Sequence, residues 1–346
     1  MRKILKKITF SLLIIILIFS NDKANIGFID QLTSSYQFDI IFWEIKNLPK
    51  KYIPIFKKSD LSQSFVREAF ENNNINSNQL KIELFLEKEI SNKIKIKLGK
   101  KYLFPPIDFV MQDSPKVLVI SPRDKIVQQY VLLINPNIPI EKIKEIENSI
   151  DRRNLSSIIV NTGGFASYPS MVKKNNNYDY MISTISHEWL HQYLFFSPFG
   201  QAYFRGGEMI QLNETLADIF GKEIANLSKE KNIFYPDDFY NNFLKETRLE
   251  VDRLLENNQI IIAEKYMKNR TLLLQSLGYK TRKINQAYFA FHGNYGSSPS
   301  SLSDFDEKLL DLRNEYDSLG LYLDDLKKVK NIEEFNKLIN LKTTEN

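Results

Sequence analysis

The residues best suited to chemistry lie in one short stretch, Met181 to Phe196, which reads MISTISHEWLHQYLFF. It contains His187, Glu188 and His191 in an H-E-x-x-H pattern, inside an apolar run without Gly or Pro that predicts a helix. Residues four apart lie one turn above each other on one helix face, so both imidazoles can reach a single metal ion. Glu188 lies beside that face, where it can take a proton from a metal-bound water.

A second polar segment follows at residues 213–218, which read N-E-T-L-A-D inside a predicted helix from Glu208 to Leu227. Catalytic zinc usually takes three protein ligands, and Glu214 is the best placed carboxylate to join the two histidines. Asp218 lies one turn later, where it can accept a hydrogen bond from the other ring nitrogen of His187.

Each segment alone also has a plainer interpretation. The histidines of a helix are often satisfied by ordinary hydrogen bonds, and N-E-T-L-A-D is compatible with a solvated helix face. Together, the two segments favour a metal site.

H-E-W-L-H followed by N-E-T-L-A-D resembles the gluzincin group of zinc metallopeptidases, which includes thermolysin-like endopeptidases and aminopeptidases of the thermolysin fold. The resemblance covers about residues 157 to 228. It implies zinc bound by His187, His191 and Glu214, with Glu188 as general base for peptide hydrolysis. Glu214 follows His191 by 23 residues, a somewhat longer spacing than is usual in the group. No third histidine follows at short range, which excludes the metzincin pattern.

The resemblance also implies a hydrogen-bond donor to the oxyanion of the tetrahedral intermediate, contributed by the helical half. His292, the only histidine outside the motif, and Tyr295 lie where a predicted helix meets a Gly-containing turn. Tyr203, between the second histidine and Glu214, is the third candidate. A lone histidine in an aromatic cluster is more often structural than catalytic, so His292 is not preferred outright over the two tyrosines. All three alternatives stay open.

The first 24 residues predict an export segment. Four basic residues precede an apolar run from Ile8 to Phe19 that is shorter than the about 20 residues of a membrane span. A cleaved signal peptide and an uncleaved membrane anchor with its N-terminus inside are the main alternatives, and a buried N-terminal helix fits the basic cluster poorly. Either main alternative makes the protein secreted, periplasmic or attached to the cell envelope. The absence of cysteine excludes a lipoprotein anchor.

The formal net charge of +5 comes mostly from these four residues, and residues 8–346 carry only +1. The charge pattern therefore predicts no nucleic-acid partner. A peptide or protein substrate is expected, together with a membrane if the N-terminal segment is retained.

Hydrophobic periodicity predicts an N-terminal helical region over residues 25–115, and the resemblance implies a zincin-like catalytic domain over 116–346. Short β-branched runs before the H-E-x-x-H helix predict a small sheet, at 117–120, 128–134 and 157–160. One predicted helix begins at a cap at Ser59 or Asp60, and another runs from a cap at Asp237 or Asp238 to residue 257. The other main helices are predicted at residues 38–45, 78–98, 141–150, 260–277, 282–291, 304–319 and 322–339.

The resemblance to gluzincins implies that an edge strand of this sheet lies along the active-site cleft, and residues 160–166 are the candidate because the glycines at 163 and 164 would let a substrate backbone come close. Gly163, Gly164 and Phe165 would then contact an extended substrate that adds as a further strand, while a simple turn is the alternative.

The sequence thus predicts a mostly helical α+β protein with a zincin-like catalytic domain, a small sheet before the H-E-x-x-H helix and an all-α C-terminal part. The predicted function is an exported zinc metallopeptidase, with endo- and aminopeptidase action unresolved. The alternatives are a catalytically inactive peptide-binding protein of the same fold and a zinc hydrolase that acts on other bonds.

Overall fold

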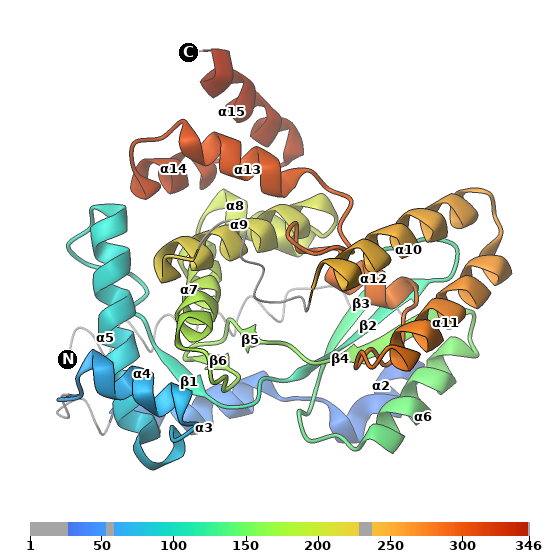
Figure 1. Ribbon diagram of the computed structural model, residues 1–346, viewed down its shortest axis with the longest axis horizontal. Helices are drawn as coiled ribbons and strands as arrows, with labels where there is room; N and C mark the ends of the chain where they lie inside the picture. Colours follow the sequence, from blue (N-terminus) through green and yellow to red (C-terminus); the bar gives the residue numbers. More distant parts are fainter. Residues whose placement is uncertain (1–26, 53–58, 228–236, 345–346) are drawn as a thin grey trace.

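The computed structural model describes residues 27–52, 59–227 and 237–344 (Figure 1). The predicted export segment at residues 1–24 lies outside them. The described part is α+β and mostly helical, with two small three-stranded sheets that precede the H-E-x-x-H helix and only helices after it. The predicted fold class is confirmed at this level.

One half of the molecule is built on an antiparallel sheet of order β3-β2-β4, in which Val117 pairs with both Leu133 and Val160. Alternate side chains of a strand point to opposite faces, and both faces are covered here. Val117 and Val119 pack against the helices α10–α12, whereas Leu118 and Ile120 pack against α6 and α2 (Figure 1). The elements of this half are α2 (Gly27–Thr33), η1 (Ser34–Tyr36), β2 (Lys116–Pro122), β3 (Tyr130–Ile134), α6 (Ile140–Asp151), β4 (Leu155–Val160), α10 (Asp238–Glu256), α11 (Ile260–Ser276) and α12 (Gln286–His292).

The other half surrounds two packed helices, α7 and α9, and contains the larger apolar core. A small sheet of order β1-β6-β5 lies beside α7, with β1 parallel to β6 and β5 at the edge. The elements are α3 (Ile40–Tyr52), α4 (Gln63–Glu71), η3 (Asn76–Asn78), α5 (Gln79–Leu98), β1 (Phe109–Met111), β5 (Gly164–Phe165), β6 (Ser170–Val172), α7 (Tyr178–Leu194), α8 (Pro198–Ala202), η4 (Tyr203–Arg205), α9 (Glu208–Ala225), α13 (Phe305–Asn314), α14 (Leu319–Leu326) and α15 (Ile332–Thr344).

Residues far apart in the chain share this second core. Val66 of α4 and Leu86 of α5 lie in the same buried cluster as Leu190 of α7, Leu216 of α9 and Phe335 of α15. The helices of residues 59–98 and those of the C-terminal segment therefore enclose the same two central helices (Figure 1).

Two hydrogen bonds hold the helix α7, one at its first turn and one at Trp189. The side chain of Asn177 accepts a hydrogen bond from the backbone N–H of Tyr180 and caps the first turn. Trp189, only 1% exposed, donates from its indole nitrogen to the carbonyl of Pro105. The helix is thus held in one rotational setting, which fixes the face that carries His187 and His191.

Several predicted boundaries are wrong. The helix α4 is capped by Ser62, whose hydroxyl accepts from the N–H of Phe65, and not by Ser59 or Asp60. Asn285 caps α12 in the same way, so residues 282–285 precede that helix. The predicted helix at 304–319 ends at Asn314, and the one at 322–339 is two helices, because the chain leaves helical geometry between α14 and α15.

None of the helices in the described ranges combines the length and apolar character needed to cross a membrane.

Candidate metal centre

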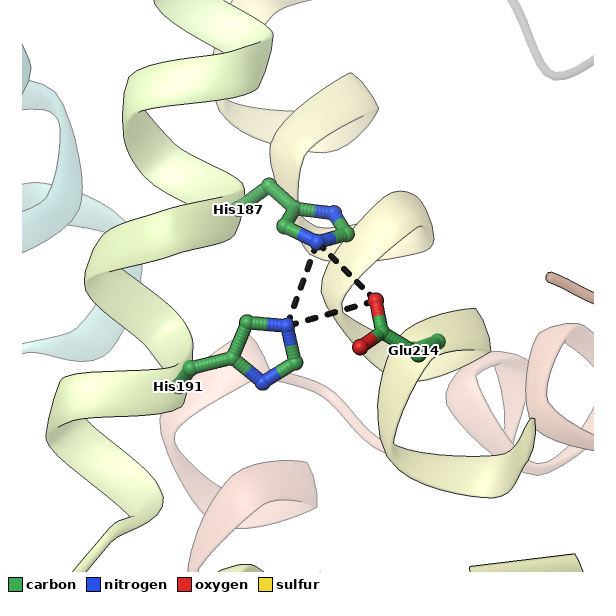
Figure 2. A group of neighbouring side chains, drawn as sticks. All are labelled: His187, His191 and Glu214. Atoms are coloured by element: carbon green, nitrogen blue, oxygen red, sulfur yellow. Dashed lines mark hydrogen bonds and ion pairs between the residues drawn. The ribbon is translucent and has the colours of Figure 1, made fainter. Parts of the chain in front are cut away.

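The two predicted ligand segments meet because α7 and α9 pack with their backbones in contact. A Cβ at Gly221 of α9 would lie only 2.5 Å from the carbonyl oxygen of Ser183, so any side chain there would separate the helices. Across this contact, Glu214 faces His187 and His191, which lie one turn apart on α7 (Figure 2).

Three ligand atoms form a small triangle. The Nε2 atoms of His187 and His191 are 3.1 Å apart, and they lie 3.3 and 3.5 Å from Oε2 of Glu214. Zinc bound at 2.0–2.1 Å in tetrahedral geometry separates neighbouring ligand atoms by about 3.3–3.4 Å. The edges of the triangle match that spacing, so the group could hold a metal ion with one position left for another ligand.

Two further residues orient the ligands. Asp218 lies one turn after Glu214, and its Oδ1 is 3.0 Å from Nδ1 of His187, which leaves Nε2 directed at the centre of the triangle. Tyr203 donates its hydroxyl proton to Oε1 of Glu214 at 3.0 Å, which leaves Oε2 to face the histidines. Both ligand planes are therefore set by partners outside the triangle.

The charges of the centre reinforce one another. Burial alone would raise the pKa of Glu214, but His191 and His187 outweigh it and hold that pKa well below its usual range. Burial would likewise lower the pKa of His187, yet hydrogen bonds to Asp218 and Glu214 raise it well above its usual value. The carboxylates thus favour positive charge at the centre, which a proton on His187 supplies in the metal-free site and which a bound metal ion would replace.

Glu188 lies in a confined space between α7 and β5. Glu188 is only 7% exposed. Burial raises the pKa of its carboxyl group, although His187 and His191 oppose that shift. A Cβ at Gly164 would lie 2.8 Å from Cγ and Cδ of Glu188. The glycine predicted to let a substrate approach is therefore already required by Glu188 itself.

The predicted edge at residues 163–165 is part of a strand. Gly164 and Phe165 form β5 and pair only with Val172 and Met171 of β6 among the described strands. The carbonyl of Gly163 accepts a hydrogen bond from the N–H of Lys173. The strand β5 therefore lies next to Glu188, and the edge of β5 that faces away from β6 is not paired to a described strand.

The three oxyanion candidates have different surroundings. The ring of Tyr295 lies 6.5 Å from that of His187, and the nearby carboxylates of Glu214 and Asp218 add to burial in raising the pKa of Tyr295. His292 instead packs against Tyr288 with ring centroids 4.3 Å apart, and burial lowers its pKa to about 4. Tyr203 contacts Glu214, as described above.

Three residues beside the ligands were not predicted to take part in the site. Ser297 donates to Oδ2 of Asp218, and the hydroxyl of Thr215 accepts from the N–H of Gly296. The hydroxyl of Tyr180 lies against Gly163, at 3.0 Å from the position of a Cβ there. Thr215 lies within the N-E-T-L-A-D segment, and Tyr180 lies two helical turns before His187 on the same face, whereas nothing in the sequence points to Ser297.

Comparison of the chain with protein-family models, with curated proteins and with solved structures gives no match in any of the three. What the site does is therefore inferred from its own geometry.

Proposed function

We propose that this chain is a zinc-dependent metallopeptidase with a gluzincin-like site, in which His187, His191 and Glu214 hold the metal. The observation that carries the proposal is the triangle of two imidazole nitrogens and one carboxylate oxygen with edges of 3.1–3.5 Å. Two histidines and one carboxylate, with a position left open, are a typical ligand set of catalytic zinc. Calcium and magnesium favour all-oxygen sites, which makes them poor matches.

The residues around the triangle suit hydrolysis of a peptide bond. Zinc supplies Lewis acidity that polarises a substrate carbonyl and lowers the pKa of water. Glu188 accepts a proton from the attacking water as the C–O bond to the substrate carbonyl carbon forms, and it delivers that proton to the leaving amine as the C–N bond breaks. In the metal-free site burial raises the pKa of Glu188, which makes its carboxylate a stronger base toward the proton of water.

The edge of β5 supports an extended peptide as the substrate. A peptide that pairs with Gly164 and Phe165 would continue the β1-β6-β5 sheet, and its carbonyls would pass beside Glu188. This pairing uses backbone groups and so fits substrates of varied sequence. Tyr295, whose ring approaches His187, is the preferred donor to the oxyanion.

The proposal includes export, on the evidence of the basic and apolar N-terminal sequence. A reporter fused after residue 30 is expected outside the cytoplasm. Neutral replacements of the four basic residues at 2, 3, 6 and 7 are expected to impair that export. A reporter that stays in the cytoplasm with the natural sequence would contradict the assignment.

The deciding experiment is mass spectrometry of a peptide library incubated with the purified full-length chain. We expect the zinc-loaded protein to cleave peptides. We expect no cleavage after chelation of the metal, and none by Glu188→Gln, although this variant should bind zinc like the natural protein. A zinc-loaded protein that leaves every peptide intact would overturn the proposal. Hydrolysis of esters or small amides in that case would identify a different class of zinc hydrolase.

A further inference from the structure

Asp218 controls the ring of His187 only if its own carboxylate is held. A carboxylate bound through one oxygen can still turn about its Cβ–Cγ bond and carry the imidazole with it. Here Oδ1 contacts His187 and Oδ2 accepts a hydrogen bond from the hydroxyl of Ser297 at 3.1 Å, so both oxygens are engaged. Ser297 is 79 residues away from Asp218 in the chain.

The segment that carries Ser297 is anchored to α9. The N–H of Gly296 donates to the hydroxyl of Thr215 at 2.9 Å, and that hydroxyl donates to the carbonyl of Gln211 at 2.6 Å. A Cβ at Gly296 would lie 2.7 Å from Thr215, so the segment runs directly against the helix. Thr215 is the residue next to Glu214, which places this anchor beside a ligand.

The same segment begins with Tyr295, whose ring approaches His187. Three successive residues therefore reach the centre in different ways: Tyr295 through its ring, Gly296 through Thr215 and Ser297 through Asp218. Such a continuous contact fixes the α9 carboxylate and the tyrosine relative to each other.

We infer that Ser297 is a positioning residue of the metal centre, which acts on His187 by holding the second oxygen of Asp218. A purely structural role fits the surroundings of Ser297 less well. The residue is only partly buried and borders a polar hollow of about 380 Å³, which is also lined by Asn241, Ser298 and Asp306. In Ser297→Ala we expect water from this hollow to take the place of the hydroxyl, so that the fold survives while the carboxylate of Asp218 loses its fixed orientation.

The test measures zinc affinity of the full chain by competition with a chromogenic chelator. Ser297→Ala is expected to bind zinc about 10-fold more weakly, at the low end of the range for partners outside the ligand shell. Ser297→Thr keeps the hydroxyl and should restore most of the affinity. Ser303→Ala is the matched control, because the Ser303 hydroxyl pairs with Ser301 in the same loop.

Two further readouts separate positioning from folding. The urea midpoint of the metal-free protein should be the same for Ser297→Ala and the natural sequence. Ser297→Ala should also add nothing to the affinity loss of Asp218→Asn, because the two residues act through one path. Natural zinc affinity in Ser297→Ala, an additive loss with Asp218→Asn or a lowered metal-free midpoint would each overturn the inference.

The inference rests on the metal site of the proposed function but not on peptide hydrolysis, since no substrate is used. If the natural chain binds no zinc, the proposed function itself fails. If it binds zinc and the serine variant binds equally well, only the role of Ser297 is refuted.

Discussion

The contact between Gly164 and Glu188 allows the base to be displaced without touching a ligand. In Gly164→Ala the new Cβ would lie 2.8 Å from Cγ and Cδ of Glu188. Carbon atoms in contact rest about 3.5–4.0 Å apart, so the glutamate side chain must retreat by roughly 1 Å. Glu188 is 7% exposed and has little free space, so this overpacking should destabilise the protein by about 1–3 kcal/mol.

The effect on turnover should be much larger than the effect on folding. A misplacement of about 1 Å in a reacting group can reduce the rate by about 100-fold. Zinc content should stay near one per chain, because His187, His191 and Glu214 are untouched. Turnover of a peptide found in the library screen, metal analysis and urea unfolding measure the three quantities separately.

The matched control is Gly27→Ala, where a Cβ would meet nothing within 4 Å. It should behave like the natural protein in all three measurements. If Gly164→Ala keeps natural turnover, the carboxylate of Glu188 does not work from its position against β5. If the variant instead loses zinc, residue 164 supports the ligands rather than the base.

Three further predictions test the electrostatics of buried carboxylates and the choice of oxyanion donor. Burial raises the pKa of Glu44 to about 7, so the protonated group stabilises the fold by about 3 kcal/mol below about pH 4.5, and this stabilisation is lost as the pH rises through 7. Glu44→Gln should therefore stabilise the protein at pH 8 and change its stability little at pH 4.5. Urea titrations at both pH values measure the two effects. Arg282 binds both oxygens of the buried Glu147, so Arg282→Met should destabilise the protein by about 3 kcal/mol, and adding Glu147→Met should recover part of that loss in thermal unfolding. Tyr295→Phe should lower kcat by about 100-fold with zinc retained, whereas His292→Phe should leave kcat within about 2-fold; the reverse order in peptide turnover would restore the histidine as the donor.

The residues that share one helix face in the site could be predicted from the sequence, because helical periodicity alone places them there. His187 and His191 lie four apart, as do Glu214 and Asp218, and the helix alone decides that each pair shares a face. That the two faces meet depends on the close packing at Gly221, which no local pattern encodes. The prediction that these two faces meet comes from the resemblance alone, and the structure shows His187, His191 and Glu214 close together.

The long-range contacts could not be predicted from the sequence. The parallel pairing of β1 with β6 joins Val110 to Met171, and the hydrogen bond of Ser297 to Asp218 spans 79 residues. Neither leaves a periodic signal, because each partner is constrained only by the finished fold. The break between α14 and α15 was missed because apolar residues continue at helical spacing on both sides of it.

The shared core of α4, α5, α7, α9 and α15 has a consequence for the order of events during synthesis. A nascent chain that ends after α9 already contains His187, His191 and Glu214, but it lacks Phe335 and the other C-terminal side chains that complete the core around them. The apolar core that supports the two ligand-bearing helices is therefore complete only when synthesis has passed Phe335.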